Sequence, residues 1–311
     1  MEYVFGPVPS RRLGRSLGID PIPSKTCNFQ CIYCQLGRTN HFTNTRQSFY
    51  SYQEILNEVK QVLNNQGKEI DFITFVGSGE PTLYKDLGLT IQGVKNLTDI
   101  PICVITNGAL LYEQEVREEI MDADIILPTL DAGDSNSFIR INRPHPSIKY
   151  DAMIKGFLDF RSNFGGKFWI EVMLMKNIND SREELKKIKI ILDQIQPDRI
   201  DINFPIRPPA EKWVEIPNKE VFVRLDEIFG IYSEIVHFPK LKSFKIYSNN
   251  FEKELTSIIG RHPMRQSSII KTFQSEVFTE DKIIEELKIL ESQNIIEELI
   301  YGSEKFWTLK R

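Results

Sequence analysis

Three cysteines lie within eight residues of this sequence, at Cys27, Cys31 and Cys34. Thiolates on so short a loop can ligate one metal centre, but three of them leave a tetrahedral zinc or iron ion one ligand short. A 4Fe–4S cluster held by three cysteines keeps one iron open to a ligand that is not protein. The fourth cysteine, Cys103, lies inside an apolar run. The spacing predicts an open iron–sulfur cluster, and a zinc ion bound by the three cysteines and His41 is the alternative.

Short apolar strands alternate with amphipathic helices through the first two-thirds of the chain. Repeated strand–helix units are typical of a parallel sheet, and the six units found here can close into an incomplete barrel. The expected strands are Ser16–Ile22, Asp71–Val76, Ile100–Thr106, Asp124–Thr129, Lys167–Leu174 and Arg199–Phe204. The expected helices are Tyr52–Asn65, Asp86–Asn96, Glu113–Met121, Asp151–Phe164, Arg182–Ile195 and Asn218–Ile231.

Polar and glycine-bearing turns follow these strands. Gly77-Ser78-Gly79-Glu80 comes after the second strand, Asn107 after the third and Asp131 after the fourth. Because the sites of parallel α/β proteins lie at the carboxyl ends of the strands, we expect these turns and the cysteine loop to face one cavity. The two glycines would let the backbone approach a ligand closely, although a plain strand-to-helix turn explains them as well.

The cysteine spacing, with Tyr33 before the last cysteine and the run Gly77-Ser78-Gly79-Glu80-Pro81 one strand later, resembles the radical S-adenosylmethionine (SAM) superfamily. The resemblance covers roughly residues 7–207. More narrowly, residues 5–38, the run Gly79-Glu80-Pro81-Thr82-Leu83-Tyr84 and the run Arg207-Pro208-Pro209 are similar to a bacterial and archaeal group of iron–sulfur oxidoreductases. That group is related to the tRNA wyosine-base synthetases.

This resemblance implies a partial (β/α)6 TIM-like barrel whose three clustered cysteines bind a 4Fe–4S cluster. The open iron of such a cluster chelates the amino and carboxylate groups of SAM, and an electron from a donor such as flavodoxin or ferredoxin then breaks a C–S bond of SAM. The resulting 5′-deoxyadenosyl radical abstracts hydrogen from the substrate. The resemblance assigns no catalytic side chain, and it leaves the substrate open between RNA, a protein and a small molecule.

The resemblance also implies a set of SAM-binding residues. Glu80 has the charge to pair with the methionine ammonium group, and Tyr33 would lie near adenine, with simple packing as its alternative. Asn107 and Asp131 could contact the ribose or the methionine carboxyl region, but asparagine and aspartate also suit the turns in which they lie. The expected set is Tyr33, Gly77, Ser78, Gly79, Glu80, Asn107 and Asp131.

Basic residues could bind an anionic group of a substrate. Arg207 precedes two prolines that stiffen the backbone, and it is a substrate-binding candidate. Solvated or salt-bridged arginines are the preferred interpretation of two further basic clusters. Glu171 would need a partner if its side chain pointed into the barrel. The two clusters are Arg11, Arg12 and Arg15, and Arg140, Arg143 and His145.

The pattern changes near Asn249 to closely spaced helices. Three helices followed by a hairpin predict a winged helix-turn-helix domain. The sequence therefore divides into a barrel at residues 1–233, a linker at 234–248 and a winged-helix domain at 249–311. The expected helices are Phe251–Ile259, Gln266–Thr272 and Glu280–Gln293, and the expected hairpin strands are Ile295–Leu299 and Lys305–Leu309.

The third of these helices is acidic, with four acidic residues and two lysines in residues 279–288. Contact with phosphates requires clustered cations, so duplex DNA is not an expected partner, and docking or dimerisation is the preferred role. The rival function for the whole chain is a redox- or iron-sensing regulator in which the cluster controls the winged helix. The acidic helix and the SAM-type turns both argue against this regulator.

Composition limits the remaining possibilities. The 311 residues are 41% hydrophobic and 26% charged, which is typical of a soluble globular protein. The net charge of −4 gives no general attraction to nucleic acid or anionic lipid. No apolar run approaches the ~20 residues that span a bilayer, and the first residues do not resemble a signal peptide. Clustered cysteines do not suggest a disulfide framework, so a cytoplasmic protein without a membrane partner is expected.

Overall fold

The computed structural model describes residues 2–66, 69–230, 236–237, 250–276 and 278–310. Its main sheet has eight strands in the order β1-β2-β5-β6-β7-β8-β9-β10. Neighbours from β2 to β10 are parallel, and β1 (Val4–Ser10) adds an antiparallel edge strand. The parallel strands are β2 (Gly14–Ile19), β5 (Phe72–Phe75), β6 (Ile102–Thr106), β7 (Ile125–Pro128), β8 (Lys167–Met173), β9 (Arg199–Asn203) and β10 (Val236–His237).

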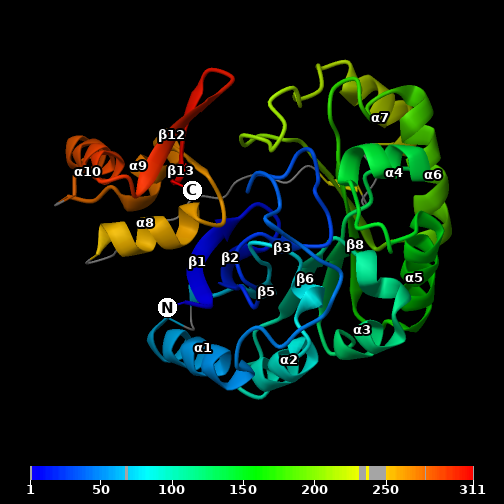
Figure 1. The fold of residues 1–311 in the computed structure, drawn as a ribbon, viewed down its shortest axis with the longest axis horizontal. Coiled ribbons are helices and arrows are strands. Elements are labelled where there is room, and N and C mark those ends of the chain that lie inside the picture. Colours follow the sequence, from blue (N-terminus) through cyan, green and yellow to red (C-terminus); the bar gives the residue numbers. More distant parts are fainter. Residues whose placement is uncertain (1, 67–68, 231–235, 238–249, 277, 311) are drawn as a thin grey trace.

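Helices cover the outer face of this curved sheet (Figure 1). They alternate with the strands along the chain, so the protein has the α/β fold with a mostly parallel sheet that is typical of a partial barrel. The helices are α1 (Tyr52–Gln66), α2 (Leu87–Lys95), α3 (Gln114–Glu119), α4 (Ser135–Asn142), α5 (Tyr150–Asn163), α6 (Arg182–Ile195) and α7 (Val221–Phe229). Short elements near the site are β3 (Thr26–Cys27), β4 (His41–Phe42) and the 3-10 turns η2 (Pro81–Leu83) and η3 (Ala109–Tyr112).

The sheet has an apolar layer on each face. In α1, Ile55, Val59 and Val62 recur at helical spacing, are at most 3% exposed and belong to the large core between helices and sheet. On β6, Val104 belongs to this core, whereas its neighbour Cys103 lies in a smaller apolar cluster inside the barrel. Successive side chains of a strand point to opposite faces. Cys103 is therefore part of the inner packing and is removed from the cysteine loop.

The sequence predictions hold for the longer elements of the barrel and miss several others, among them β1 and α4. The six expected strands and six expected helices of the barrel part are present, although the expected helix end at Ile231 lies outside the described residues. Strand β1 was not expected because it contains Pro7 and Pro9, which an edge strand tolerates. Helix α4 was not expected because it is short; the side chain of Asp134 caps it by accepting from Ser137 N at 2.9 Å.

Most of the expected linker at 234–248 lies outside the described residues. Two residues within it, Val236 and His237, form β10 and pair in parallel with β9. The sheet thus gains a strand that the sequence did not predict. None of the helices in the described ranges is both long and apolar enough to cross a membrane.

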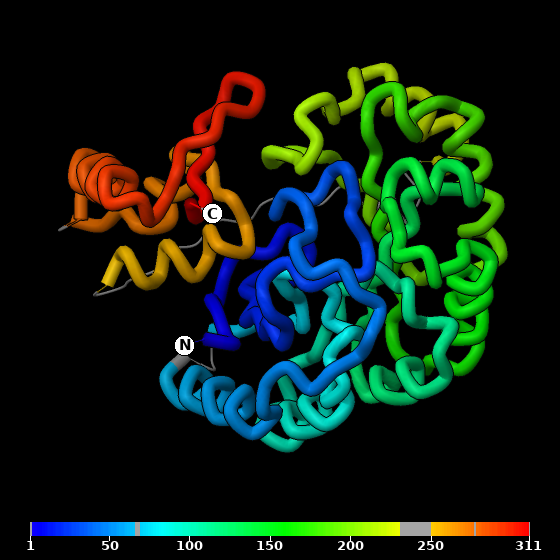
Figure 2. Tube along the Cα trace, in the orientation of Figure 1, coloured from blue at the N-terminus to red at the C-terminus, as the bar shows by residue number. Residues whose placement is uncertain are grey.

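Residues 250–310 form a second packed unit with its own core (Figure 2). Helices α8, α9 and α10 pack beside a three-stranded sheet in the order β11-β13-β12. The unit lies against β1, because Val8 of β1 packs on its core. Its elements are α8 (Phe251–Ile259), β11 (Met264–Arg265), α9 (Gln266–Phe273), α10 (Glu280–Ser292), β12 (Ile296–Tyr301) and β13 (Glu304–Leu309). We call residues 250–310 the C-terminal unit.

Candidate active site

One cavity of about 500 Å³ lies at the carboxyl ends of the parallel strands. This volume is within the range of small-molecule sites. Its lining includes all three clustered cysteines, the turn Gly77-Ser78-Gly79 after β5, and Met173 and Asn203 at the ends of β8 and β9. The cysteine loop and the glycine turn therefore share one cavity, as expected, whereas Asn107 and Asp131, expected in the same cavity, are not among its lining residues.

The cysteine loop is held in place by apolar side chains between the cysteines. Phe29 is 2% exposed and Ile32 is fully buried, and both belong to the barrel core. Backbone bonds tighten the loop further, because Cys34 N donates to Cys31 O at 3.1 Å. Core packing at the intervening positions leaves the sulfur-bearing residues at the cavity.

The three thiols lie near one another. None of them is in a disulfide, all are half-buried, and the pKa of Cys31 is raised by burial and then by Cys27 and Cys34. Yet in the described part of the chain no three His, Cys, Asp or Glu side chains are arranged to hold one metal ion. A cubane cluster spaces its ligands more widely than one ion does. His41, the expected fourth ligand of a zinc site, is exposed on β4.

Amide groups donate toward two of the sulfurs. Asn107 Nδ2 lies 3.8 Å from Cys27 Sγ, and Asn142 Nδ2 lies 3.6 Å from Cys31 Sγ. Hydrogen bonds to sulfur favour the thiolate form and tune a metal centre bound to it. Asn142 was not singled out from the sequence, because it lies at the end of the unpredicted helix α4.

Tyr33 and Asp131, both expected near SAM, are bonded to each other. Tyr33 Oη donates to Asp131 Oδ2 at 2.6 Å, and the same oxygen accepts from Asn142 Nδ2 at 2.9 Å. The other oxygen of Asp131 accepts from Met173 N at 2.9 Å. Burial raises the pKa of Asp131 to about 6, although these hydrogen bonds act in the opposite direction. Tyr33 lines the cavity, whereas the carboxylate of Asp131 is buried and already engaged.

Glu80 is also engaged within the protein. Its carboxylate accepts from Thr82 N at 3.0 Å, from Thr106 Oγ1 at 2.5 Å and from Asn107 N at 2.7 Å. The residue is 2% exposed, and burial raises its pKa while these bonds lower it. Glu80 therefore ties the turn after β5 to the end of β6, and Asn107 belongs to the same network.

The glycine turn lies directly on the cysteine loop. Glu80 N donates to Thr26 O at 3.0 Å, and Lys25 N donates to Ser78 O at 2.6 Å. A Cβ atom on Gly79 would overlap the carbonyl group of Thr26, which directly precedes Cys27. Gly79 is thus required for the contact between the two segments. From the sequence, Gly79 was expected either to let the backbone approach a bound ligand or to form a plain strand-to-helix turn.

The C-terminal unit reaches this turn through one buried aspartate. Asp20 accepts from Ser78 N at 3.1 Å and from Ser78 Oγ at 2.8 Å. Arg261 of the C-terminal unit forms an ion pair with Asp20, with Nε and Oδ2 2.7 Å apart. Burial raises the pKa of Asp20, and Arg261 opposes this shift. Sequence reasoning missed this connection, because 241 residues separate the two partners.

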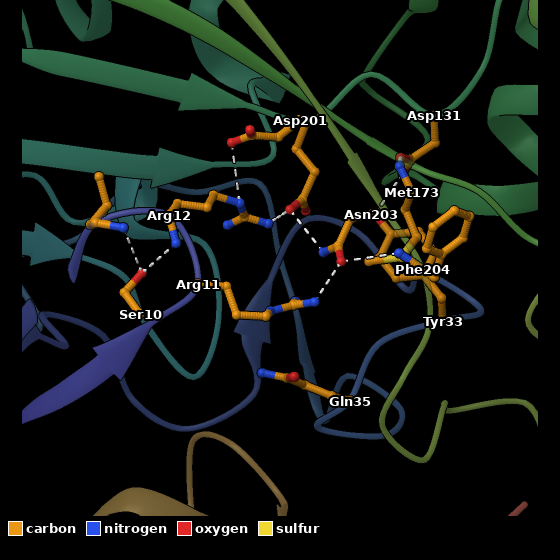
Figure 3. Close-up of polar contacts among 12 residues, drawn as sticks. Ser10, Arg11, Arg12, Tyr33, Gln35, Asp131, Met173, Asp201, Asn203 and Phe204 are labelled. Atoms are coloured by element: carbon orange, nitrogen blue, oxygen red, sulfur yellow. Dashed lines mark hydrogen bonds and ion pairs between the residues drawn. The ribbon is translucent and has the colours of Figure 1, made fainter. Parts of the chain in front are cut away.

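Glu171 points into the barrel, where the sequence analysis expected it to need a partner. It pairs with Arg12, which also lies 3.3 Å from Asp201, and it accepts from Asn203 Nδ2 at 3.0 Å. Figure 3 shows Arg12 extending toward Asp201 while Arg11 points to Asn203. Arg11 Nη1 donates to Asn203 Oδ1 at 2.8 Å. Both arginines line the cavity.

The remaining members of the two basic clusters are not among the cavity-lining residues. Arg143 pairs with Glu211 at 2.6 Å, and Arg15 pairs with Glu69 at 3.3 Å. Arg140 donates to a backbone carbonyl group at 2.6 Å, and His145 bonds to a serine at 2.8 Å. The preferred interpretation of these residues as salt-bridged or surface groups agrees with their contacts.

Comparison with known proteins identifies the class to which this fold and site belong. The sequence model of the Radical SAM superfamily matches residues 22–188, which include the cysteine loop and the glycine turn. The chain belongs to this superfamily of enzymes, whose cofactors are a 4Fe–4S cluster and SAM.

Two relatives within the comparison match most of this chain in sequence. The chain is 38% identical to the UPF0026 protein MJ1312 of Methanocaldococcus jannaschii over 277 residues, covering 86% of this chain and 85% of that protein. It is 42% identical over 306 residues to a Brachyspira hyodysenteriae protein named GTPase Obg, covering 97% of this chain. The chain spans only 44% of that second relative, so the activity in its name is not transferred.

A solved structure shares the fold. Streptococcus suis SuiB bound to S-adenosylmethionine superimposes with a TM-score of 0.54 and 17% sequence identity. The match covers 73% of this chain and 50% of SuiB. At this identity the likeness concerns the fold, and it agrees with the partial barrel described above.

Proposed function

We propose that this radical SAM enzyme binds its 4Fe–4S cluster through Cys27, Cys31 and Cys34 and abstracts hydrogen from a substrate held in the same cavity. The supporting observation is that the three clustered cysteines, none of them in a disulfide, line one cavity together with the glycine turn. When bound, the cluster and SAM supply the 5′-deoxyadenosyl radical. No side chain is assigned a catalytic role.

The chain's own residues hold and orient these groups. Asn107 and Asn142 donate toward the cysteine sulfurs, and Asp131 fixes Tyr33 at the cavity wall. The lining supports direct SAM contact for Tyr33, Gly77, Ser78 and Gly79. The buried contacts of Glu80, Asn107 and Asp131 support a positioning role for these three instead.

For the chain as a whole we propose a barrel at 1–233, a linker at 234–248 and a winged-helix domain at 249–311. Three helices beside a three-stranded sheet support the winged-helix assignment. Its residues Arg265 and Phe306 line the cavity, which favours a part in closing the active site over a regulatory DNA contact. A reduced flavodoxin or ferredoxin is the proposed electron donor, and the substrate can be RNA, a protein or a small molecule.

Cysteine replacement tests this function. After anaerobic reconstitution we expect about four irons per chain, and loss of them in Cys27→Ala, Cys31→Ala and Cys34→Ala. Cys103→Ala is the matched control and should keep the iron, because Cys103 packs with Ile125 and Leu127 inside the barrel. Iron assay and 5′-deoxyadenosine release under dithionite are the measurements. Stoichiometric zinc with no iron uptake would contradict the proposal.

A further inference from the structure

Three arginines from distant parts of the chain meet at one wall of the cavity. Arg11 lies in the turn between β1 and β2, Arg207 follows β9, and Arg265 belongs to β11 of the C-terminal unit. We call these three residues the arginine wall. Their proximity is visible in their electrostatics, because Arg11 and Arg265 both lower the pKa of Arg207.

The partners of the arginine wall are neutral. Arg11 donates to Asn203 Oδ1 at 2.8 Å, and Arg207 donates to Gln35 Oε1 at 3.1 Å. Arg207 also donates to a backbone carbonyl group, that of Pro263, at 3.1 Å.

The third member, Arg265, has its guanidinium 5.6 Å from the ring centre of Phe306. Among the residues that the structure describes, no carboxylate forms an ion pair with any member of the wall. The described hydrogen-bond partners of Arg11 and Arg207 are neutral, although the charge of Asp201, which is also paired with Arg12 and Arg199, acts on Arg11. The positive charge of the wall is therefore only partly compensated.

The nearby carboxylates already form ion pairs with another arginine, Arg12. Glu171 is the sole carboxylate residue in the lining of this cavity within the described residues, and it pairs with Arg12, as does Asp201. Burial lowers the pKa of Arg207 to about 9, with Arg11, Arg12 and Arg265 acting in the same direction. Arg207 therefore stays protonated at neutral pH, in a place where like charges repel one another. An anion bound at this wall would relieve that repulsion.

A half-buried histidine of the cavity lining, His262, adds no charge. His262 lines the cavity, and its pKa is lowered to about 3 by burial and then by Arg207 and Arg261. Its Nδ1 atom lies 2.7 Å from Gln35 Nε2. A neutral imidazole beside the arginines can accept or donate a hydrogen bond but does not compete for the anion.

The arginine wall adjoins the end of the cysteine loop. Arg207 donates to Gln35, and Gln35 directly follows Cys34. The described hydrogen bonds to the sulfurs of Cys27 and Cys31 come from amide groups and not from the wall.

We propose that Arg11, Arg207 and Arg265 form a subsite for a phosphate group of a small-molecule substrate. This inference rests on the proposed function, since it concerns the substrate of the same cavity. Guanidinium groups bind phosphate oxygens through paired N–H donors, and several arginines can surround one phosphate. The wall is part of a cavity of small-molecule size, whereas the net charge of −4 offers no general attraction for a nucleic-acid backbone.

Calorimetry with inorganic pyrophosphate on the reconstituted enzyme tests the subsite. We expect measurable binding by the parent and an at least tenfold weaker affinity in Arg11→Gln, Arg207→Gln and Arg265→Gln. Arg265→Gln is the safest variant structurally, because its described contact is one ring face. Arg182→Gln is the matched control and should bind like the parent, because Arg182 pairs with Glu227 on the surface.

Two further readouts separate this proposal from the function on which it rests. SAM affinity, measured in the same variants, should stay within about twofold of the parent, because the wall is proposed to hold the substrate and not SAM. If the arginine variants lose SAM, the wall holds the SAM carboxylate and the proposal is overturned. Absence of pyrophosphate binding, or binding of single-stranded RNA in its place, overturns it too. A parent that binds pyrophosphate but releases no 5′-deoxyadenosine contradicts the proposed function instead.

Discussion

The two ends of the cavity are built in different ways. At the cysteine end, neighbouring backbone segments lie directly on one another, as when Glu80 N donates to Thr26 O at 3.0 Å. At the arginine wall, side chains come from segments as far apart as Arg11 and Arg265, and long flexible groups bridge the space. A backbone contact fixes atoms more tightly than an arginine side chain with many rotamers. The cysteine end is thus suited to holding a cofactor in a fixed geometry, and the arginine wall to a ligand around which side chains can adjust.

The contrast between the cysteine end and the arginine wall predicts that a substitution at Gly79 has the largest effect on iron content. In Gly79→Val the new side chain would overlap the carbonyl group of Thr26 and displace the segment that carries Cys27. We expect iron content and visible absorbance after reconstitution to fall well below those of the parent, together with SAM binding.

Gly165→Ala is the matched control for Gly79, because nothing lies within 4 Å of a Cβ atom built there. It should reconstitute like the parent. Full iron content in Gly79→Val would show that the two backbone segments can separate without loss of the cluster site, and the contrast between the two ends would disappear.

A second, smaller effect is expected where the C-terminal unit meets the cysteine end. Arg261→Met leaves the buried carboxylate of Asp20 without its cation. Breaking a buried ion pair by removing one partner lowers the free energy of unfolding by about 3 kcal/mol, whereas a surface pair contributes at most about 1 kcal/mol. Urea unfolding of Arg261→Met, with Arg182→Met as the surface control, measures the difference. Adding Asp20→Asn to Arg261→Met should recover part of the loss. Equal effects of the two arginines would argue that this contact is peripheral.

The smallest effect concerns pH and the buried carboxyl group behind Tyr33. The pKa of Asp131 is raised from 3.8 to about 6 on folding, so its protonated form is favoured in the folded state. Ionised Asp131 therefore destabilises the folded state relative to its protonated form. As the pH rises from about 4 to above 6, the free energy of unfolding of the parent falls relative to that of Asp131→Asn. For these two pKa values the expected change between pH 5 and pH 7 is about 1 kcal/mol.

Urea unfolding of parent and Asp131→Asn at both pH values gives this difference, and Asp193→Asn on the surface of α6 serves as the control. If the stability gap between the parent and Asp131→Asn is the same at pH 5 and pH 7, the hydrogen bonds from Tyr33, Asn142 and Met173 already outweigh the burial of Asp131.

Local patterns predicted the cysteine end, whereas long-range contacts determined the rest of the site. The spacing of the cysteines and the glycine turn both lie within short runs of sequence, and helices such as α6 and α8 begin and end where the apolar periodicity predicted. The sequence showed that Glu80 carries a charge but not which groups bind it. Its partners Thr106 and Asn107 lie at the end of a different strand, β6. The meeting of Arg207 with Arg265 requires the packing of two units. The spacing of residues along the sequence does not predict how two separately packed units lie against each other.

Because the C-terminal unit supplies part of the cavity wall, the active site is assembled in a definite order during synthesis. The ribosome makes the barrel before residues 250–310, and domains fold as they emerge. Until those residues are made, the cysteine loop and the glycine turn can be complete while the side of the cavity formed by Arg265 and Phe306 is still open to solvent. A newly made barrel would thus present this cavity through a wider opening than the finished protein does, because Arg265 and Phe306 are not yet in place.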